Sequence, residues 1–231
     1  SDPEAEEAET TLKASALIDA IRNAEPKAKA GATRSTPVAG RKVLFVDHRD
    51  SFVHTLAGYV RATCAEVTTL RAGFDSALID DIAPDLAILS PGPGRPEDFD
   101  LSATIAELLA RKLPIFGVCL GLQGIVEYFG GELGVLDVPV HGKPSTVTTT
   151  GSQLFDGLSK NFSVGRYHSL YALKESLPEC LRVTAETADG IVMAVEHDSL
   201  PVSAVQFHPE SIMSFGDHAG QRLMENVLAG I

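Results

Sequence analysis

The chain has 231 residues, of which 44% are hydrophobic, and its net charge is −12 at pH 7. This length predicts one large domain, or one domain with an appendage, and the apolar content is sufficient for a sizeable core. The acidic balance argues against nucleic acid or an anionic membrane surface as a partner. No apolar run is long enough to span a bilayer, and the first residues are acidic rather than signal-like, so we expect a cytoplasmic protein.

The three cysteines are widely spaced and form neither a disulfide framework nor a zinc-binding pattern. This usage is typical of proteins from the reducing cytosol. We also expect this chain to hold no metal ion and no cofactor of its own.

Residues 1–40 differ in composition from the rest of the chain. Residues 1–9 are an acidic tail, and the apolar positions of 14–21 have helical spacing. Residues 22–41 contain prolines and glycines among Ala, Lys and Thr, which is typical of a linker. We predict a tail, a short helix and a linker over residues 1–40, and one main domain over residues 41–231.

Strands and helices alternate in the first part of the main domain. Apolar runs predict buried strands at 43–46, 85–90 and 115–118, and the alternating pattern of 65–70 predicts a further strand. Helical patterns lie between or after them, at 51–60 (with Ser51 as the cap), 75–82, 101–111 and 120–129. This order predicts an α/β domain with an open, mostly parallel central sheet flanked by helices.

The second half of the domain is richer in β-structure and is expected to be a smaller, β-rich portion of it. Its predicted strands are at 138–150, 162–171, 181–186, 191–196 and 202–207, followed by a closing helix at 220–228. Residues 181–196 read as a hairpin around an Ala-Asp-Gly turn.

A strand-to-helix switch places Cys119 between two glycines, in the pattern Gly117-x-Cys119-x-Gly121. This is the thiol version of the nucleophile elbow, in which glycines allow a sharp turn around an exposed nucleophile. The cysteine also lies at a helix N-terminus, where unpaired N–H groups favour a thiolate. The alternative interpretation is a small buried core cysteine.

Other polar residues follow the strands that end at the same sheet edge as Cys119, where α/β proteins bind ligands. Asp47 and His48 follow the first strand, and the Pro-Gly-Pro-Gly turn of 91–94 follows another. This turn lacks the third glycine of a dinucleotide-binding fingerprint, which argues against a nucleotide site.

The pair His208-x-Glu210 follows the last strand, so both side chains can point to the same side. A thiolate nucleophile needs a nearby base, and the base needs an orienting carboxylate. Cys119, His208 and Glu210 can supply these three roles. Two metal ligands are the alternative, but no further cluster of ligands accompanies the pair.

Five motifs resemble the class I (triad) glutamine amidotransferases, and within them the amidotransferase component of anthranilate synthases. They are Gly117-Val-Cys-Leu-Gly-Leu-Gln123, Ser90-Pro-Gly-Pro-Gly94, His141-Gly-Lys-Pro-Ser145, Tyr167-His-Ser-Leu170 and Gln206-Phe-His-Pro-Glu-Ser211. The resemblance covers residues 42–229. One position departs from the family, which usually has His where this chain has Leu122.

The resemblance implies that Cys119 attacks the side-chain amide of glutamine, that His208 transfers the proton, and that Glu210 holds the imidazole. It also implies an oxyanion site and a glutamine-binding site, with the candidate residues Gly92, Pro93, Gly94, Leu120, Gln123, Ser169 and Leu170. The implied partners are glutamine and a chorismate-using synthase component, fused or separate. The implied whole enzyme is a dimer whose synthase component binds Mg²⁺.

Residues 9–21 are similar to the C-terminal end of the synthase component in fused anthranilate synthases. We therefore expect this chain to be the amidotransferase portion of such a fusion, although an ordinary N-terminal extension is the alternative. The ammonia acceptor could instead belong to aminodeoxychorismate or phenazine synthesis. A free-standing γ-glutamyl hydrolase and a non-catalytic docking module are the other interpretations.

Overall fold

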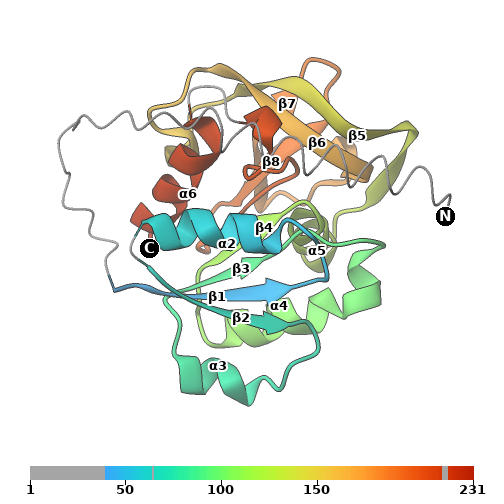
Figure 1. Ribbon diagram of the computed structural model, residues 1–231. Helices are drawn as coiled ribbons and strands as arrows, with labels where there is room; N and C mark the ends of the chain where they lie inside the picture. The colour runs from blue at the N-terminus through green and yellow to red at the C-terminus, as the bar shows by residue number, and fades with distance from the viewer. Residues whose placement is uncertain (1–39, 64, 215–217) are drawn as a thin grey trace, which may run out of the picture. The chain divides into compact units, whose positions relative to one another are not determined.

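The computed structural model describes residues 40–63, 65–214 and 218–231 of the chain (Figure 1). The predicted acidic tail, short helix and linker therefore lie outside the described residues, except for Gly40. No helix in the described part has the length and apolar character needed to cross a membrane.

Nine strands and five α-helices make up the described domain. The strands are β1 (Lys42–Asp47), β2 (Glu66–Arg71), β3 (Leu86–Leu89), β4 (Ile115–Val118), β5 (Leu133–Thr149), β6 (Asn161–Ala172), β7 (Leu181–Thr187), β8 (Val192–His197) and β9 (Val202–Val205). The helices are α2 (Val53–Ala62), α3 (Ala77–Ile82), α4 (Leu101–Ala110), α5 (Leu120–Tyr128) and α6 (Ala219–Ala229).

All nine strands belong to one sheet, in the order β2-β1-β3-β4-β9-β8-β7-β5-β6. The first five strands in this order are parallel to one another. The remaining strands, beginning with β8 beside β9, pair antiparallel. The predicted α/β class is confirmed, and the β-rich second half is a direct continuation of the parallel sheet.

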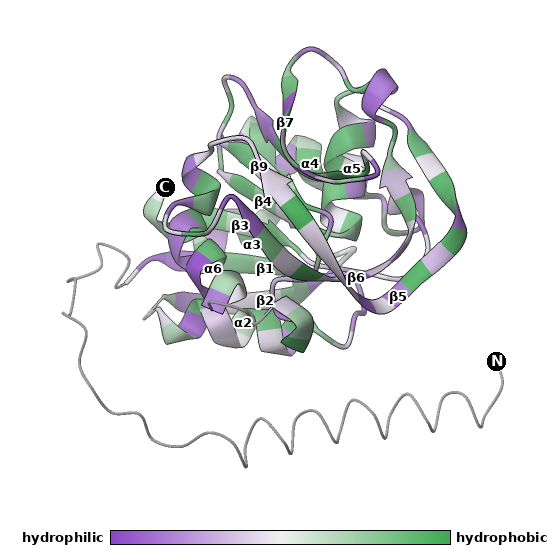
Figure 2. Ribbon diagram, turned by 90° about the horizontal axis from the view of Figure 1, so that it is seen from above, coloured by the Kyte–Doolittle hydropathy of each residue, from purple (hydrophilic) through white to green (hydrophobic). Residues whose placement is uncertain are grey.

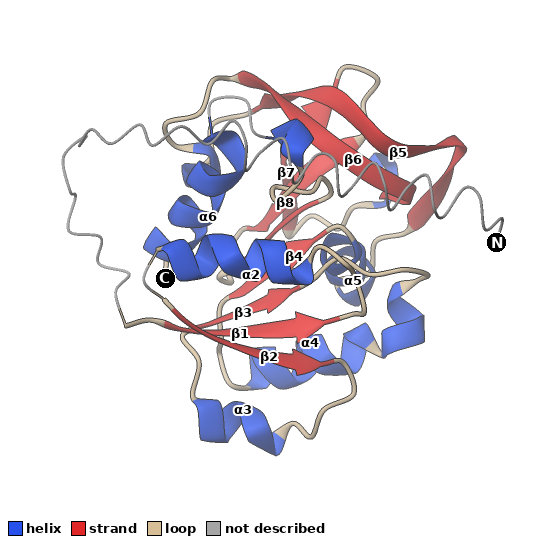
Figure 3. Ribbon diagram, in the orientation of Figure 1, coloured by secondary structure: helices blue, strands red, loops and turns tan. Residues whose placement is uncertain are grey.

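Helices cover both faces of the parallel half of the sheet (Figure 3). On one face, Val43 and Phe45 of β1 belong to a core with residues of α2 and α6. On the other face, Leu44 and Val46 belong to a core with residues of α3, α4 and α5. Successive side chains of a strand point to opposite faces, so a strand buried on both faces is apolar throughout. Figure 2 shows this as the hydrophobic colour of the central strands.

The structure differs from the sequence prediction at the start of α2 and at the start of β5. Ser51 was expected to cap α2 and does not, because the helix begins at Val53 with Phe52 at the N-cap position. The Asp50 carboxylate accepts a 2.7 Å hydrogen bond from the Phe52 N–H, which forms a local turn that competes with a Ser51 cap. Strand β5 begins at Leu133, five residues before the predicted start.

Candidate active site

The strand-to-helix switch predicted around Cys119 is present between β4 and α5. Cys119 has φ of 53° and ψ of −99°, a strained conformation for a residue with a side chain. A methyl group added at Gly117 would lie 2.6 Å from the backbone of Gly121, and one added at Gly121 would lie 2.5 Å from the Leu89 carbonyl oxygen. The two glycines therefore permit the close packing that presents the cysteine at the sheet edge.

Two backbone N–H groups next to Cys119 are available to a ligand. No acceptor among the described residues takes a hydrogen bond from the N–H of Leu120 or of Gly92. The two residues are packed together, because a methyl group added at Gly92 would lie 2.5 Å from the Leu120 side chain. The N–H of Cys119 donates instead to the Val205 carbonyl oxygen at 2.8 Å, which ties the elbow to β9.

His48 and Ser90 hold the turn that contains Gly92. The His48 N–H donates to Ser90 Oγ at 2.9 Å, and Ser90 O–H donates to the Pro91 carbonyl oxygen at 2.7 Å. The His48 Nδ1 lies 3.1 Å from the Ser90 carbonyl oxygen. Burial lowers the pKa of His48 to about 4, although the Ser90 hydrogen bond and the Asp47 charge oppose this shift. His48 is therefore a neutral supporting residue at physiological pH.

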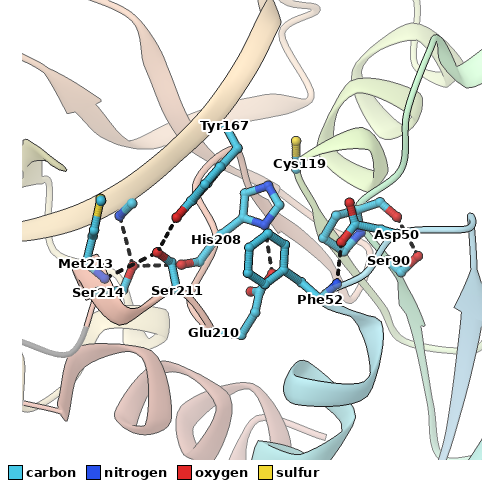
Figure 4. A network of polar contacts seen from close by, with 12 residues as sticks. Asp50, Phe52, Ser90, Cys119, Tyr167, His208, Glu210, Ser211, Met213 and Ser214 are labelled. Carbon is cyan, nitrogen blue, oxygen red and sulfur yellow. Dashed lines mark hydrogen bonds and ion pairs between the residues drawn. The ribbon is translucent and has the colours of Figure 1, made fainter. Parts of the chain in front are cut away.

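His208 and Glu210 form a buried pair directly after β9. Glu210 Oε1 lies 2.7 Å from His208 Nδ1, and the two side chains are 0% and 2% exposed, respectively. The rings of Phe52 and Tyr167 pack against the imidazole, with centroid distances of 5.4 and 5.0 Å. Figure 4 shows the imidazole between Glu210 and Cys119, so the three predicted catalytic side chains lie together.

The electrostatic environment of His208 favours the imidazolium. Burial lowers the pKa of His208, but the charges of Glu210 and Cys119 outweigh burial and raise it well above the usual value. No described group forms a hydrogen bond with His208 Nε2, which leaves this nitrogen available for proton transfer. The arrangement therefore suits a thiolate–imidazolium pair that attacks a carbonyl carbon and protonates its leaving group.

A pocket of about 260 Å³ opens over Cys119. It is close to the lower end of the roughly 300–1,000 Å³ typical of small-molecule sites. Seven of the predicted site residues line it, namely Gly92, Pro93, Gly94, Cys119, Gln123, Ser169 and Leu170. The other three do not: Leu120 is buried against Gly92, and His208 and Glu210 are buried outside the pocket lining.

The structure adds three residues to the predicted site, namely Gln206, His168 and Phe52. The Gln206 side-chain nitrogen lies 3.5 Å from Cys119 Sγ, and His168 lines the pocket. Gln206 precedes His208 by two residues, and this spacing could have suggested that both side chains lie on the same side of the chain. The contact of Phe52 with His208 joins segments far apart in sequence, so no local pattern predicts it.

Within the described residues, no three His, Cys, Asp or Glu side chains gather closely enough to hold a metal ion. The pocket itself is lined by a thiol, an amide, hydroxyl groups, the imidazoles of His141 and His168, apolar side chains and backbone. These are groups that suit covalent catalysis on a small polar substrate.

Residues 44–228 match the family model "Glutamine amidotransferase class-I". An anthranilate synthase of Azospirillum brasilense is 58% identical over 233 residues, which cover 99% of this chain and 31% of that protein. This chain thus spans about a third of the length of that relative. The aminodeoxychorismate/anthranilate synthase component 2 of Bacillus subtilis is 41% identical, with 79% of this chain and 95% of that protein covered.

A solved structure of a glutamine amidotransferase from Thermotoga maritima shares the fold, with a TM-score of 0.62 and 14% identity. The likeness covers 82% of this chain and 95% of that one. The family match covers most of the chain, and the geometry around Cys119, His208 and Glu210 agrees with it. The chain belongs to the class I glutamine amidotransferase family.

Proposed function

We propose that this chain hydrolyses glutamine to glutamate and ammonia through Cys119, His208 and Glu210, and delivers the ammonia to a chorismate-using synthase that makes anthranilate. The observation that carries the proposal is the buried His208–Glu210 pair beside an elbow cysteine, at a pocket lined by the predicted glutamine-binding residues. The name and the high identity of the Azospirillum relative support anthranilate as the product.

In the first half of the reaction, the Cys119 thiolate attacks the side-chain amide carbon of glutamine and a C–S bond forms. The N–H groups of Leu120 and Gly92 stabilise the oxyanion. The C–N bond then breaks as the His208 imidazolium protonates the leaving nitrogen. Ammonia departs and a glutamyl thioester remains on Cys119.

In the second half, a water molecule attacks the thioester carbon and gives its proton to His208. The C–S bond breaks, the electron pair returns to sulfur, and glutamate leaves. Glu210 keeps the imidazole oriented and stabilises its charged form in both halves. The rings of Phe52 and Tyr167 keep bulk water away from His208.

The match to the Azospirillum relative covers 99% of this chain, and so extends over the N-terminal segment that resembles the end of a synthase component. This supports residues 1–40 as the end of a synthase portion and its linker. On this proposal Mg²⁺ binds in the synthase portion, the whole enzyme is a dimer, and it works in the cytoplasm.

Aminodeoxychorismate synthesis is the second candidate, because the Bacillus relative is named for both products. The acceptor chemistry belongs to the synthase, so product analysis with chorismate separates the two candidates and would also reveal a phenazine precursor.

Replacement of the nucleophile tests the division of labour. We expect Cys119→Ser to abolish glutamine-dependent anthranilate formation and to leave ammonia-dependent formation nearly unchanged, because ammonia bypasses the thioester. Cys180→Ser is the matched control, since Cys180 is a free, partly buried cysteine that does not line the pocket. It should retain both activities. An equal loss of ammonia-dependent synthesis in Cys119→Ser would contradict the proposal.

A further inference from the structure

We propose that Gln206 is a further catalytic residue, whose side-chain amide donates a hydrogen bond to Cys119 Sγ and stabilises the thiolate as it leaves the glutamyl thioester. The inference rests on the glutamine hydrolysis proposed above and adds a residue that neither the catalytic triad nor the oxyanion site contains.

Gln206 is held rigidly beside the nucleophile. It follows β9 directly, and its backbone N–H donates to the Met193 carbonyl oxygen of β8 at 2.9 Å. Its exposed fraction is 0%, and its Nε2 lies 3.5 Å from Cys119 Sγ, within hydrogen-bond distance for sulfur. A fully buried side-chain amide needs hydrogen-bond partners for both its oxygen and its NH₂ group. The orientation of the Gln206 amide therefore decides which of the two faces the Cys119 sulfur.

A chain of buried hydrogen bonds determines which end of each group donates. It begins at Arg166, whose Nε can only donate, and which lies 3.0 Å from His168 Nε2. His168 Nε2 must therefore accept. Burial and the Arg166 charge lower the pKa of His168 to about 4, so the ring is neutral and carries its proton on Nδ1. This proton is donated to the Leu170 carbonyl oxygen at 2.8 Å.

The Leu170 carbonyl oxygen can only accept, so it fixes the orientation of the Gln123 side-chain amide. Gln123 Nε2 lies 3.2 Å from that carbonyl oxygen and 3.4 Å from Gln206 Oε1, so both its hydrogens have acceptors. With its oxygen facing Gln123, Gln206 must direct its NH₂ group to Cys119. The chain from Arg166 thus delivers one oriented N–H to the nucleophile.

This donor matters most when the sulfur is charged, because hydrogen bonds to ionised acceptors are the strongest. In the first half-reaction the sulfur gives up its charge, and in the second it regains it as the C–S bond breaks. The imidazole of His208 is occupied at that moment with the proton of the attacking water. Gln206 is the neutral donor that remains beside the departing thiolate.

The test replaces the donor and keeps the shape. Gln206→Glu retains an oxygen facing Gln123 but puts a carboxylate oxygen in place of the NH₂ that faces the sulfur. Gln206→Met removes both polar ends at similar volume. Gln221→Glu is the matched control, because Gln221 lies on the exposed side of α6, where its amide contacts Glu225. All variants are made in the protein assembled with its synthase and assayed with glutamine and chorismate.

We expect both Gln206 variants to lower kcat for glutamate release roughly tenfold or more, as for the loss of a hydrogen bond to a charged group. KM should fall with kcat, because slow thioester hydrolysis becomes rate-limiting. Acid quenching followed by mass spectrometry should show the glutamyl adduct on Cys119 at a higher level than in wild type and in Gln221→Glu.

A Gln206→Glu enzyme with wild-type turnover would overturn the inference. So would a lower kcat in both variants with unchanged KM and no accumulated adduct, which would indicate only structural support. If the wild-type protein releases no glutamate at all, the proposed function fails. If the wild type releases glutamate and Gln206→Glu releases it at the same rate, only the role of Gln206 fails.

Discussion

Three buried histidines surround the site, and their neighbours give them different protonation states. Burial lowers the pKa of all three, and it prevails for His48 and His168, which both reach about 4. In His208, burial is outweighed by the charges of Glu210 and Cys119. At neutral pH, therefore, His208 is the one of these three that can act as an acid, and the other two act as fixed neutral hydrogen-bonding groups.

Removing the charge of Glu210 tests this assignment. Glu210→Gln keeps the shape but loses the negative charge that raises the pKa of His208, so we expect kcat for glutamate release to fall by on the order of a hundredfold or more. Because the pKa of His208 falls, the alkaline limb of the kcat/KM profile should move to lower pH. Glu225→Gln, on the surface of α6, is the control. An unchanged pH profile in Glu210→Gln would refute the electrostatic role of Glu210.

Local patterns predicted Cys119, His208 and Glu210 but not the buried side chains that support them. Cys119 was predicted from flanking glycines, and His208 and Glu210 from a pair after a strand. Gln206 and His168 gain their roles from hydrogen bonds to segments more than 80 residues away and to a neighbouring arginine, respectively. Such roles depend on the folded arrangement, and a single sequence carries no direct signal of it.

At the scale of elements, the elbow depends on how closely α5 approaches the sheet. Gly121 lies in the first turn of α5 and packs directly on the backbone of β3 at Leu89. The helix N-terminus, and with it the N–H of Leu120, is positioned by this contact. A displacement of α5 would therefore change both the nucleophile and the proposed oxyanion site.

Gly121→Ala tests this packing. The added methyl group would meet a backbone oxygen that cannot rotate away, so we expect a loss of about 1–3 kcal/mol in the free energy of unfolding and a large loss of glutaminase activity. Gly58→Ala is the matched control, because nothing lies within 4 Å of its added methyl group in α2. That variant should be neutral or stabilised by up to about 1 kcal/mol in urea unfolding. Equal stability of the two variants would contradict the packing argument.

Most elements were predictable because their apolar patterns are local. The runs at 43–46 and 115–118 are short, apolar and bounded by polar residues, Pro or Gly, and they form β1 and β4. The start of β5 was not predictable, because its first residues pair only with Leu170–Ala172 before an irregularity between Val135 and Val140. The pairing of β8 with β9, which joins the parallel and antiparallel halves into one sheet, was not predictable from local patterns either.

At the scale of the molecule, both halves of the sheet contribute residues to the pocket. The parallel half supplies Cys119 and the turn at 91–94, and β6 of the antiparallel half supplies Ser169 and Leu170. A backbone hydrogen bond of 3.0 Å from the His208 N–H to the Gly165 carbonyl oxygen joins the two halves next to the catalytic pair. The site therefore requires the whole domain to be folded.

Because the site requires the whole domain to be folded, protonation of His48 affects the free energy of unfolding of the domain. The unfolded chain binds a proton at His48 below about pH 6.5, whereas the folded chain does so only near pH 4, so stability falls as the pH drops through this interval. The shift corresponds to about 3 kcal/mol in the free energy of unfolding. Urea unfolding measures the free energy of unfolding of wild type and of His48→Asn. We expect the difference between these two free energies to change by about this amount from pH 7 to pH 4.

His54→Asn, on the exposed side of α2, is the matched control for the loss of a histidine. A difference between wild type and His48→Asn that stays constant with pH would show that His48 does not remain neutral in the folded protein.

The direct test of glutamine hydrolysis coupled to a synthase is glutamate release from glutamine, measured with and without chorismate in the protein assembled with its synthase. We expect slow release without chorismate and a many-fold increase with it, accompanied by anthranilate in proportion to glutamate. Fast release that chorismate does not change, with no anthranilate, would rule out this coupling and indicate a free-standing hydrolase.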